Sequence, residues 1–483
     1  MVSPSPNLYD NENLIDKLLS EQQKLQTPVA RFSEEYDSGF PRTDLFKHLI
    51  PLEKPKKGEQ YAFQVELDKC TGCKACVVAC HTLNGLDEDE AWRDVGLLES
   101  GNGFQQTVTT ACHHCVEPEC LHGCPVGAYE KEKDTGIVRH LDDQCIGCEY
   151  CILKCPYDVP KYSHSRGIVR KCDMCHQRLE VGEAPACVQA CPTGAISIIK
   201  VEGNEIRETG NFLPGTPTPK ITYPSTRYIG RLVPKDAASS TRSKLTPQHT
   251  HWPLVLMLTL TQIGLGLSFG GALWAGLIIF NVGMIAAVFH LGQPLKAWRF
   301  FLGLKTSWLS REILAFSLIA PLPVALLLSD LPEPFALTHT AIEWIFLPAA
   351  LGAIFTSVMI YHDTKRVTWD LKKTLPDFFL TFFAAAALFT QPLIPFAICV
   401  ALLTALDGWH LFPILKEKWS PIRHSAQLRL GPLHKFTELR FLTLGLSFLL
   451  AFISSWLALP LLITSQILSR KLFFQSVHAP KMP

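Results

Sequence analysis

The sequence predicts a loop-rich α+β domain followed by an all-α bundle of about eight membrane helices. Two observations predict this division. Sixteen of the seventeen cysteines lie between Cys70 and Cys191, whereas several long runs after residue 250 contain no charged residue. The 483 residues are 47% hydrophobic, and their mean hydropathy of +0.15 is high for a wholly soluble protein. This length fits about three domains.

The composition divides the chain into five expected segments. From residue 249 onward there are 17 Lys and Arg against 10 Asp and Glu, and the part before it is slightly acidic. A nucleic-acid partner would favour a basic patch on a soluble domain, so this charge pattern argues against one. The expected segments are an N-terminal extension (1–60), a cysteine-rich domain (61–205), a linker (206–250), a membrane anchor (251–475) and a C-terminal tail (476–483).

The N-terminal extension is polar. Five apolar residues at helical spacing predict one short amphipathic helix, which either packs on its own protein or binds a partner: Leu14, Ile15, Leu18, Leu19 and Leu25. The extension contains no apolar run followed by a cleavage site and no twin-arginine pair, so we expect no export signal.

Short runs of strand-forming residues occur in the cysteine-rich domain at 61–67, 136–141 and 195–201. Gly and Pro separate these runs, so they predict a small domain with many turns. Residues 206–248 are rich in Pro, Thr, Ser and Arg, a composition that predicts a linker.

The membrane anchor begins with residues 251–293, which contain no Asp, Glu, Lys or Arg over 43 positions. At a rise of ~1.5 Å per residue this run is about twice the bilayer thickness, and Gly270–Gly271 divides it into two spans. Residues 313–329 and 344–361 fit one span each. The runs 378–406 and 441–469 are uncharged over 29 residues each. Each is either one long tilted helix or two short helices.

Lys and Arg cluster after each pair of spans and are absent from the loops between. All loops obey the positive-inside rule only if both 29-residue runs are double spans, with Pro392, Pro395 and Pro460 as candidate breaks. The prediction is therefore eight spans in the inner membrane, with both termini and the cysteine-rich domain in the cytoplasm. Because disulfides are rare there, the cysteines point to metal or clusters.

The cysteines form four quartets, and the first and third match the bacterial ferredoxin run C-x₂-C-x₂-C-x₃-C. In that run three thiols wrap one cluster and the fourth reaches a different one. Four quartets predict four [4Fe–4S] clusters in a ferredoxin-like domain. Zinc would leave the central cysteine of each CxxCxxC unused, and disulfides are the remaining alternative. Cys399 fits a buried apolar residue within a span.

The motifs CTGCKAC, ACHHCVEPEC, CIGCEYC and KCDMC resemble the four-cluster electron-transfer subunit of the dimethyl sulfoxide reductase family of molybdoenzymes, over residues 61–200. The resemblance implies two dicluster halves and assigns four cysteines to each cluster. The implied ligands are Cys70, Cys73, Cys76 and Cys191 (set one); Cys80, Cys172, Cys175 and Cys187 (set two); Cys112, Cys115, Cys120 and Cys155 (set three); and Cys124, Cys145, Cys148 and Cys151 (set four). Set one would lie nearest the molybdenum subunit and set four nearest the membrane.

Three membrane segments are similar to the anchor subunit of the same family: HWPL at 251–254, FHLGQPLKAWR at 289–299 and SWLSREI at 307–313. The resemblance implies a fused electron-transfer and membrane-anchor subunit. It would link the quinone pool to a separate molybdopterin catalytic subunit, with quinone redox as the only chemistry on this chain. Alternatives are a cytoplasmic sulfite-type dehydrogenase complex that reduces quinone, a standalone quinone–ferredoxin link, and a structural metal-binding protein.

His290 ends the second span and is the candidate for proton transfer with quinone, because imidazole exchanges protons near neutral pH. The alternative is a histidine that anchors the helix end. Arg299 and Arg311 lie in the same loop region, where we expect them to be orientation signals rather than parts of the quinone site. Asp377 and Asp407 could relay protons, but capping or loop solvation is the expected role of each. We expect no haem, because the histidines of the anchor lie at predicted helix ends or in loops.

Overall fold

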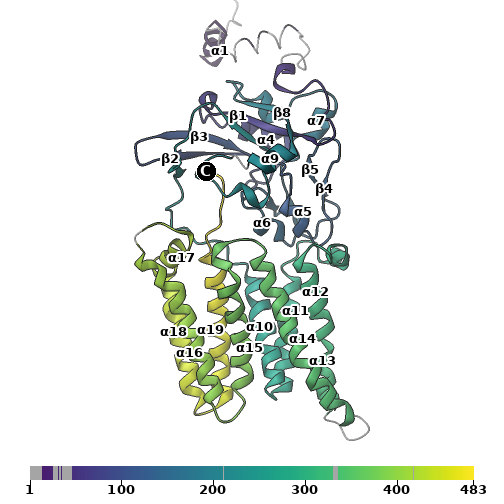
Figure 1. The fold of residues 1–483 in the computed structure, drawn as a ribbon, viewed down its shortest axis with the longest axis vertical. Helices are drawn as coiled ribbons and strands as arrows, with labels where there is room; N and C mark the ends of the chain where they lie inside the picture. The colour runs from purple at the N-terminus through teal and green to yellow at the C-terminus, as the bar shows by residue number, and fades with distance from the viewer. Residues whose placement is uncertain are drawn as a thin grey trace, which may run out of the picture.

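The computed structural model describes residues 14–24, 31, 34, 38, 46–209, 212–329, 336–416 and 418–483. Small sheets and short helices form one part of the molecule, and long helices running side by side form the other (Figure 1). Both the cysteine-rich domain and the end of the chain lie on the same side of the long helices. Ahead of the domain, helix α1 (Leu14–Lys24) is the short helix that the sequence predicts. Leu25 lies outside the described residues.

Two three-stranded sheets form the framework of the cysteine-rich domain. In the first, β1 (Glu59–Glu66) lies between antiparallel β8 (Ile196–Glu202) and parallel β9 (Arg227–Ile229). Successive residues of β1 from Gln60 to Phe63 are buried, as expected of a central strand covered on both faces. The second sheet holds β10 (Ala238–Ser239), β2 (Asp94–Glu99) and β3 (Gln105–Thr110).

Two hairpins complete the strands: β4 (Tyr129–Lys131) with β5 (Val138–His140), and β6 (Lys161–Ser163) with β7 (Ile168–Arg170). The three predicted strand runs correspond to β1, β5 and β8. Cys-Pro pairs at 124–125, 155–156 and 191–192 follow three helices of the domain, and the residue before a proline disfavours helical backbone. All the helices of the domain are short. They are α4 (Ala75–Asn84), α5 (Glu119–Gly123), α6 (Tyr150–Lys154), α7 (His176–Glu180), α8 (Ala186–Gln189) and α9 (Gly203–Thr209). Single turns lie at η1 (Lys47–Leu49), η2 (Leu67–Lys69) and η3 (Pro219–Ile221).

The expected linker needs correction. Residues 206–250 contribute β9 and β10 to the two sheets of the domain, and Leu213 and Ala237 are buried there. These strands are only three and two residues long, so they leave no periodic pattern in the sequence. The segment is therefore part of the cysteine-rich domain rather than a free tether.

In the described part of the chain, eight helical segments, here called rods, run side by side below this domain, and one of them consists of two consecutive helices (Figure 1). Five of them are long and apolar enough to cross a membrane. This agrees with the prediction of about eight helices. The rods are α10 (Trp252–Phe269), α11 (Leu273–Val288), α12 (Trp308–Ile319) continued by α13 (Pro321–Ser329), α14 (Ala336–His362), α15 (Leu371–Ala387), α16 (Ile394–Leu411), α18 (His434–Ala451) and α19 (Ser455–Gln475).

Shorter elements join the rods: η4 (Pro294–Gly303), η5 (Val367–Trp369), η6 (Phe412–Leu415) and α17 (Pro421–Leu430). Both 29-residue runs divide into two helices, as the charge pattern predicts. Pro395 lies in the first turn of α16, after the break that contains Pro392. Pro460, in contrast, lies inside α19. The break there falls at residues 452–454, so Pro460 as a break is wrong.

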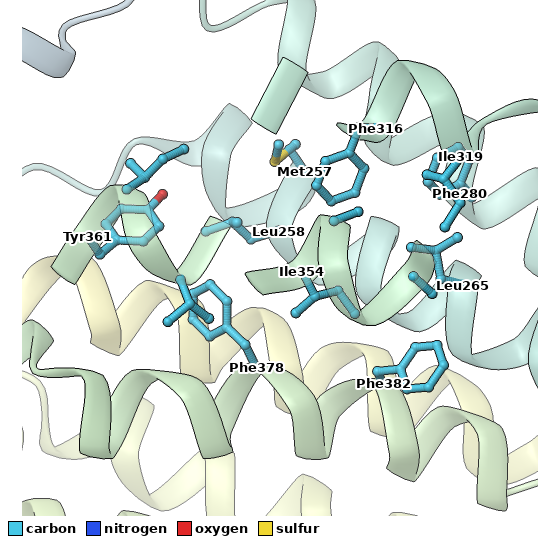
Figure 2. Packing of buried hydrophobic residues seen from close by; sticks show 14 of the residues in the cluster. Met257, Leu258, Leu265, Phe280, Phe316, Ile319, Ile354, Tyr361, Phe378 and Phe382 are labelled. Carbon is cyan, nitrogen blue, oxygen red and sulfur yellow. The ribbon is translucent and has the colours of Figure 1, made fainter. Parts of the chain in front are cut away.

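Aromatic and aliphatic side chains fill the bundle between α10, α12, α14 and α15. Leu258, Phe316, Ile354 and Phe378 belong to this cluster, and Phe316 lies beside Met257 (Figure 2). Helices α10 and α11 approach each other closely at small residues. A Cβ at Gly264 would lie 2.5 Å from the backbone nitrogen of Phe280, so no larger side chain fits. Close packing at glycine is typical of helix pairs in membranes.

The C-terminal tail leaves α19 and returns to the cysteine-rich domain, where the chain ends beside β2 (Figure 1). Met482 is 5% exposed and belongs to the hydrophobic core that contains Cys76 and Cys172. The backbone of Pro483 lies against Gly96, where a Cβ would overlap it. The tail thus connects the bundle to the domain a second time.

Candidate functional site

The loops of the first and third quartets have the same backbone. Gly72 and Lys74 have φ of 75° and 62°, and the equivalent Gly147 and Glu149 have φ of 68° and 57°. Left-handed residues between right-handed ones turn successive N–H groups toward one side, which forms an anion-binding concavity. This backbone suits a group held by thiolates.

Set one lines one cavity, which contains the thiols of Cys70, Cys73, Cys76 and Cys191 together with Thr109 and Thr193. Set three lines another, which contains Cys112, Cys115, Cys120 and Cys155. In both cases three cysteines come from one run, and the fourth comes from a run distant in sequence. The lining of both cavities therefore has the arrangement that the resemblance implies, with the fourth cysteine exchanged between runs as in ferredoxins with two clusters.

Sets two and four are also brought together. Burial, together with the nearby thiols of Cys187 and Cys175, raises the pKa of Cys80 to about 12. Burial followed by the thiols of Cys148, Cys145 and Cys124 raises the pKa of Cys151. Removing such thiols from water favours their neutral form, so binding to iron is what would make thiolates stable here.

Backbone amides point at the sulfurs, as a fit to iron–sulfur clusters requires. Ala128 N donates to Cys124 Sγ at 3.2 Å, Ala195 N to Cys191 Sγ at 3.2 Å, and Gly147 N to Cys145 Sγ at 3.3 Å. Such bonds stabilise negative charge on sulfur and tune reduction potentials. The residues present therefore fit iron–sulfur clusters.

Two buried cations between the sets have no counterpart in the sequence prediction. Arg93 is 2% exposed, and although burial opposes its charge, the thiols of Cys187, Cys76 and Cys172 raise its pKa. Lys171 is 2% exposed and lies beside Cys112 and Cys172. The position of Lys171 next to Cys172 is a weak sequence signal, whereas nothing in the sequence marks Arg93. These cations offset negative charge that clusters would carry.

A membrane loop packs directly on the loop of set four. Gln293 N donates to the carbonyl of Ile146 at 3.0 Å, and His290 Nε2 lies 2.9 Å from the carbonyl oxygen of Cys148. Gly292 lies against the backbone of Gly147 and Gly167, where a Cβ would overlap main-chain atoms. Gly292 in the HLGQ sequence thus permits close contact between the backbone of the membrane loop and that of the cysteine-rich domain.

Further contacts fix the domain on the bundle. Lys154 Nζ, 4% exposed, lies 2.8 Å from Asp363 Oδ2 and also pairs with Glu119. Ser307 Oγ donates to the carbonyl of Gly123 at 2.7 Å, and Arg299 Nη1 donates to the carbonyl of Asp143 at 3.2 Å. Arg299, which the sequence predicts as an orientation signal, therefore also joins the cysteine-rich domain to the bundle.

We predict that Gly292→Val separates the set-four loop from the bundle. A side chain at this position overlaps the Gly167 backbone, and overpacking of this kind costs ~1–3 kcal/mol or more where the backbone cannot move. Limited proteolysis should then cleave residues 289–294 faster. Gly352→Val, at a helix position with open space around its Cβ, is the matched control. Equal proteolysis of both variants would contradict the prediction.

The site around His290 has a defined hydrogen-bond direction. A carbonyl oxygen only accepts, so Nε2 of His290 carries the hydrogen and Nδ1 is left as an acceptor. The His251 ring lies 6.0 Å away, centroid to centroid, and His251 Nδ1 lies 3.5 Å from Glu149 Oε2. Apolar side chains beside His290 face outward: Phe289 is 76% exposed, Leu295 93% and Trp298 62%.

The expected roles of Asp377 and Asp407 are wrong. Asp377 pairs with Arg470, and Asp407 lies 3.6 Å from Arg429 and 3.4 Å from Arg440. All three arginines are at most 5% exposed. The acids therefore belong to buried ion pairs between helices, not to caps or solvated loops.

Comparison with known proteins agrees with both halves of this architecture. Residues 104–201 match the 4Fe-4S dicluster domain family, and residues 271–406 match the DMSO reductase anchor subunit (DmsC) family.

Relatives of the cysteine-rich domain include the B subunit of anaerobic dimethyl sulfoxide reductase from Haemophilus influenzae, 36% identical over 156 residues (30% of this chain, 76% of the relative). The corresponding B subunit of Escherichia coli K12 is 35% identical over 176 residues (34% and 84%). The formate dehydrogenase-O iron-sulfur subunit of Escherichia coli K12 is 35% identical over 158 residues (29% and 52%). The protein therefore belongs to the family of iron–sulfur subunits of anaerobic dimethyl sulfoxide reductase, and the region that follows in the same chain matches the anchor-subunit family over residues 271–406.

Proposed function

We propose that this protein passes electrons between the membrane quinone pool and a separate molybdopterin catalytic subunit, through four [4Fe–4S] clusters held by sets one to four. The observation that carries the proposal is the contact between His290 and Cys148, because it joins the quinone candidate to a cluster loop. When bound, the clusters supply one-electron redox steps. The chain's own residues hold them at fixed spacing and exclude water from them.

His290 takes the proton from quinol in this proposal. Its Nε2–H is committed to the Cys148 carbonyl, so Nδ1 is free to accept a hydroxyl proton. Quinones dissolve in the lipid and must approach from the side, and the outward-facing Phe289, Leu295 and Trp298 supply an apolar surface there. The same bond holds the imidazole against the set-four loop, so proton transfer and electron transfer take place side by side.

In this proposal electrons that enter at set four leave the protein at set one, which suits transfer to a large partner. Cys73 is exposed, and so are two apolar side chains of the helix α4 that follows it: Val78 63% and Leu83 51%. An apolar patch around an exposed redox site is typical of a protein interface. We propose that the molybdenum subunit covers this face.

The proposed location of the cysteine-rich domain is the cytoplasm, with the anchor in the inner membrane. Its support is the distribution of Lys and Arg along the loops, which the positive-inside rule places in the cytoplasm. A cytoplasmic location favours, as the second candidate function, a sulfite-type dehydrogenase complex that reduces quinone. A reporter fused after Pro483 should be active only in its cytoplasmic form, and a periplasmic signal would overturn the topology.

The proposal is tested by gentle purification of the tagged protein from membranes, with metal analysis and identification of accompanying proteins. We expect about sixteen irons from this chain, at four per cluster, and a large subunit that contains molybdenum. Electron paramagnetic resonance after dithionite reduction should show interacting [4Fe–4S] signals. A chain with its irons but no such partner would favour a standalone quinone–ferredoxin link, and a chain without iron would contradict both.

We predict that Cys151→Ser removes one cluster and leaves the other three. Cys151 is buried in set four, and serine supplies a harder ligand than iron–sulfur clusters prefer. Iron content should fall by about four per chain while dithionite still reduces the remaining clusters, and quinol should no longer reduce them. Cys399→Ser, a buried cysteine of the bundle, is the matched control. Unchanged iron in Cys151→Ser would remove this residue from the ligand set.

A further inference from the structure

A cavity of about 230 Å³ lies between the set-four loop and the bundle, and His251 forms part of its wall. The walls combine titratable side chains with aromatic ones. Glu149 and His164 come from the cysteine-rich domain, His249 and His251 from the segment before α10, and Trp369 from η5. At ~30 Å³ per water molecule it has room for several waters, and its polar lining offers them partners.

Three histidines lead from the quinone candidate past this cavity to the surface. The ring centroids of His290 and His251 are 6.0 Å apart, and those of His251 and His249 are 4.7 Å apart. The series runs from His290 through half-buried His251 to exposed His249. The spacing lets one water, or a small ring rotation, connect each pair.

The hydrogen bonds define which nitrogens are available. The backbone N–H of His251 donates to His249 Nδ1 at 3.3 Å, so the hydrogen of neutral His249 is on Nε2. His251 has a φ of 50°, an unusual backbone for a residue other than Gly, Asn or Asp. Strained backbone of this kind is retained at functional sites more often than elsewhere.

We propose that His251 and His249, with the cavity that they line, form the route by which protons released from quinol at His290 reach bulk water. This inference rests on the proposed quinone function. In the forward direction two quinol O–H bonds break and the two protons leave through the histidines. The cluster that set four would hold would take up the two electrons one at a time. The reverse direction takes up two protons by the same route.

Glu149 faces His251 from the cysteine-rich domain, with its Oε2 3.5 Å from Nδ1 of His251. A neutral imidazole accepts a proton on one nitrogen and releases one from the other. His251 can therefore pass a proton between its neighbours His290 and His249.

The test uses the full chain in detergent, mixed rapidly with a naphthoquinol, with cluster reduction followed by absorbance. His251→Asn keeps a residue that tolerates the left-handed backbone but cannot relay protons. We expect the maximal rate to fall on the order of 10-fold or more, with the quinol concentration for half-maximal rate unchanged. Added imidazole should restore part of the rate. His249→Ala, at an exposed position, should show the same loss.

His434→Asn, at an exposed position at the start of α18, is the matched control. Iron content and dithionite-driven reduction should equal those of the wild type in all variants. An unchanged rate in His251→Asn and His249→Ala would overturn the route, as would a raised half-saturating quinol concentration with an unchanged maximal rate, since the cavity would then hold the quinone ring. If quinol does not reduce the wild type at all, the quinone function itself fails.

Discussion

His290→Gln should lower quinol-driven reduction of the clusters by about 100-fold, within the range that removal of a general base produces. Glutamine keeps an N–H that can donate to the Cys148 carbonyl, so the contact with the set-four loop is preserved. It has no basic nitrogen to replace Nδ1. The measurement is the rate of cluster reduction after mixing with a naphthoquinol, at saturating quinol.

Two controls separate this effect from damage to the fold. Dithionite does not need the quinone site, so it should reduce the variant as fast as the wild type, and the iron content should be equal. His434→Gln makes the same change at an exposed helix start, where Nδ1 contacts the carbonyl of Gly431. If His290→Gln keeps the wild-type rate, His290 anchors the helix end and the quinone is protonated elsewhere.

The sequence predicts features that residues close together in the chain determine, and it does not by itself predict contacts between distant residues. Cysteines two or three residues apart report the loop that holds them, so the quartets are visible without a structure. The exchange of Cys191 and Cys80 between quartets is known only through resemblance, since these partners are more than 90 residues away from the loops that they complete. Arg93 could not be predicted, because its cysteine partners come from other runs of the chain, and Lys171 has only its neighbour Cys172 as a weak sequence signal.

In the anchor, the sequence does not show where the helices end. Charges at the ends of an uncharged run look like loop residues, and on that basis Asp377 and Asp407 are expected to be solvated. The helices extend beyond the uncharged runs: α15 begins at Leu371 and α16 ends at Leu411. Both acids therefore lie inside helices that pack on others, and their burial requires partners. Hydropathy predicts the apolar centre of a span, but it does not predict the ion pairs that charged residues form at the ends of the span.

Arg470→Leu should destabilise the bundle by ~3–5 kcal/mol, because it leaves the mostly buried carboxylate of Asp377 without its partner. Arg470 is fully buried, pairs with Asp377, and donates to Gln262 Oε1 at 2.9 Å and to Thr381 Oγ1 at 3.0 Å. These contacts join α10, α15 and α19 at one point. The measurement is thermal or denaturant unfolding of the full chain in detergent, followed by a helix signal.

The double variant Arg470→Leu with Asp377→Leu should recover most of that loss, because the unpaired charge is then gone as well. Lys416→Leu, at an exposed position, is the matched control and should change stability little. Losses that simply add in the double variant would show that the two side chains act independently. Recovery of stability in the double variant, with quinol-driven reduction at the wild-type rate, would mean that the pair serves to hold helices together. The proton route would then depend on the histidines at the set-four loop rather than on the charges of the bundle.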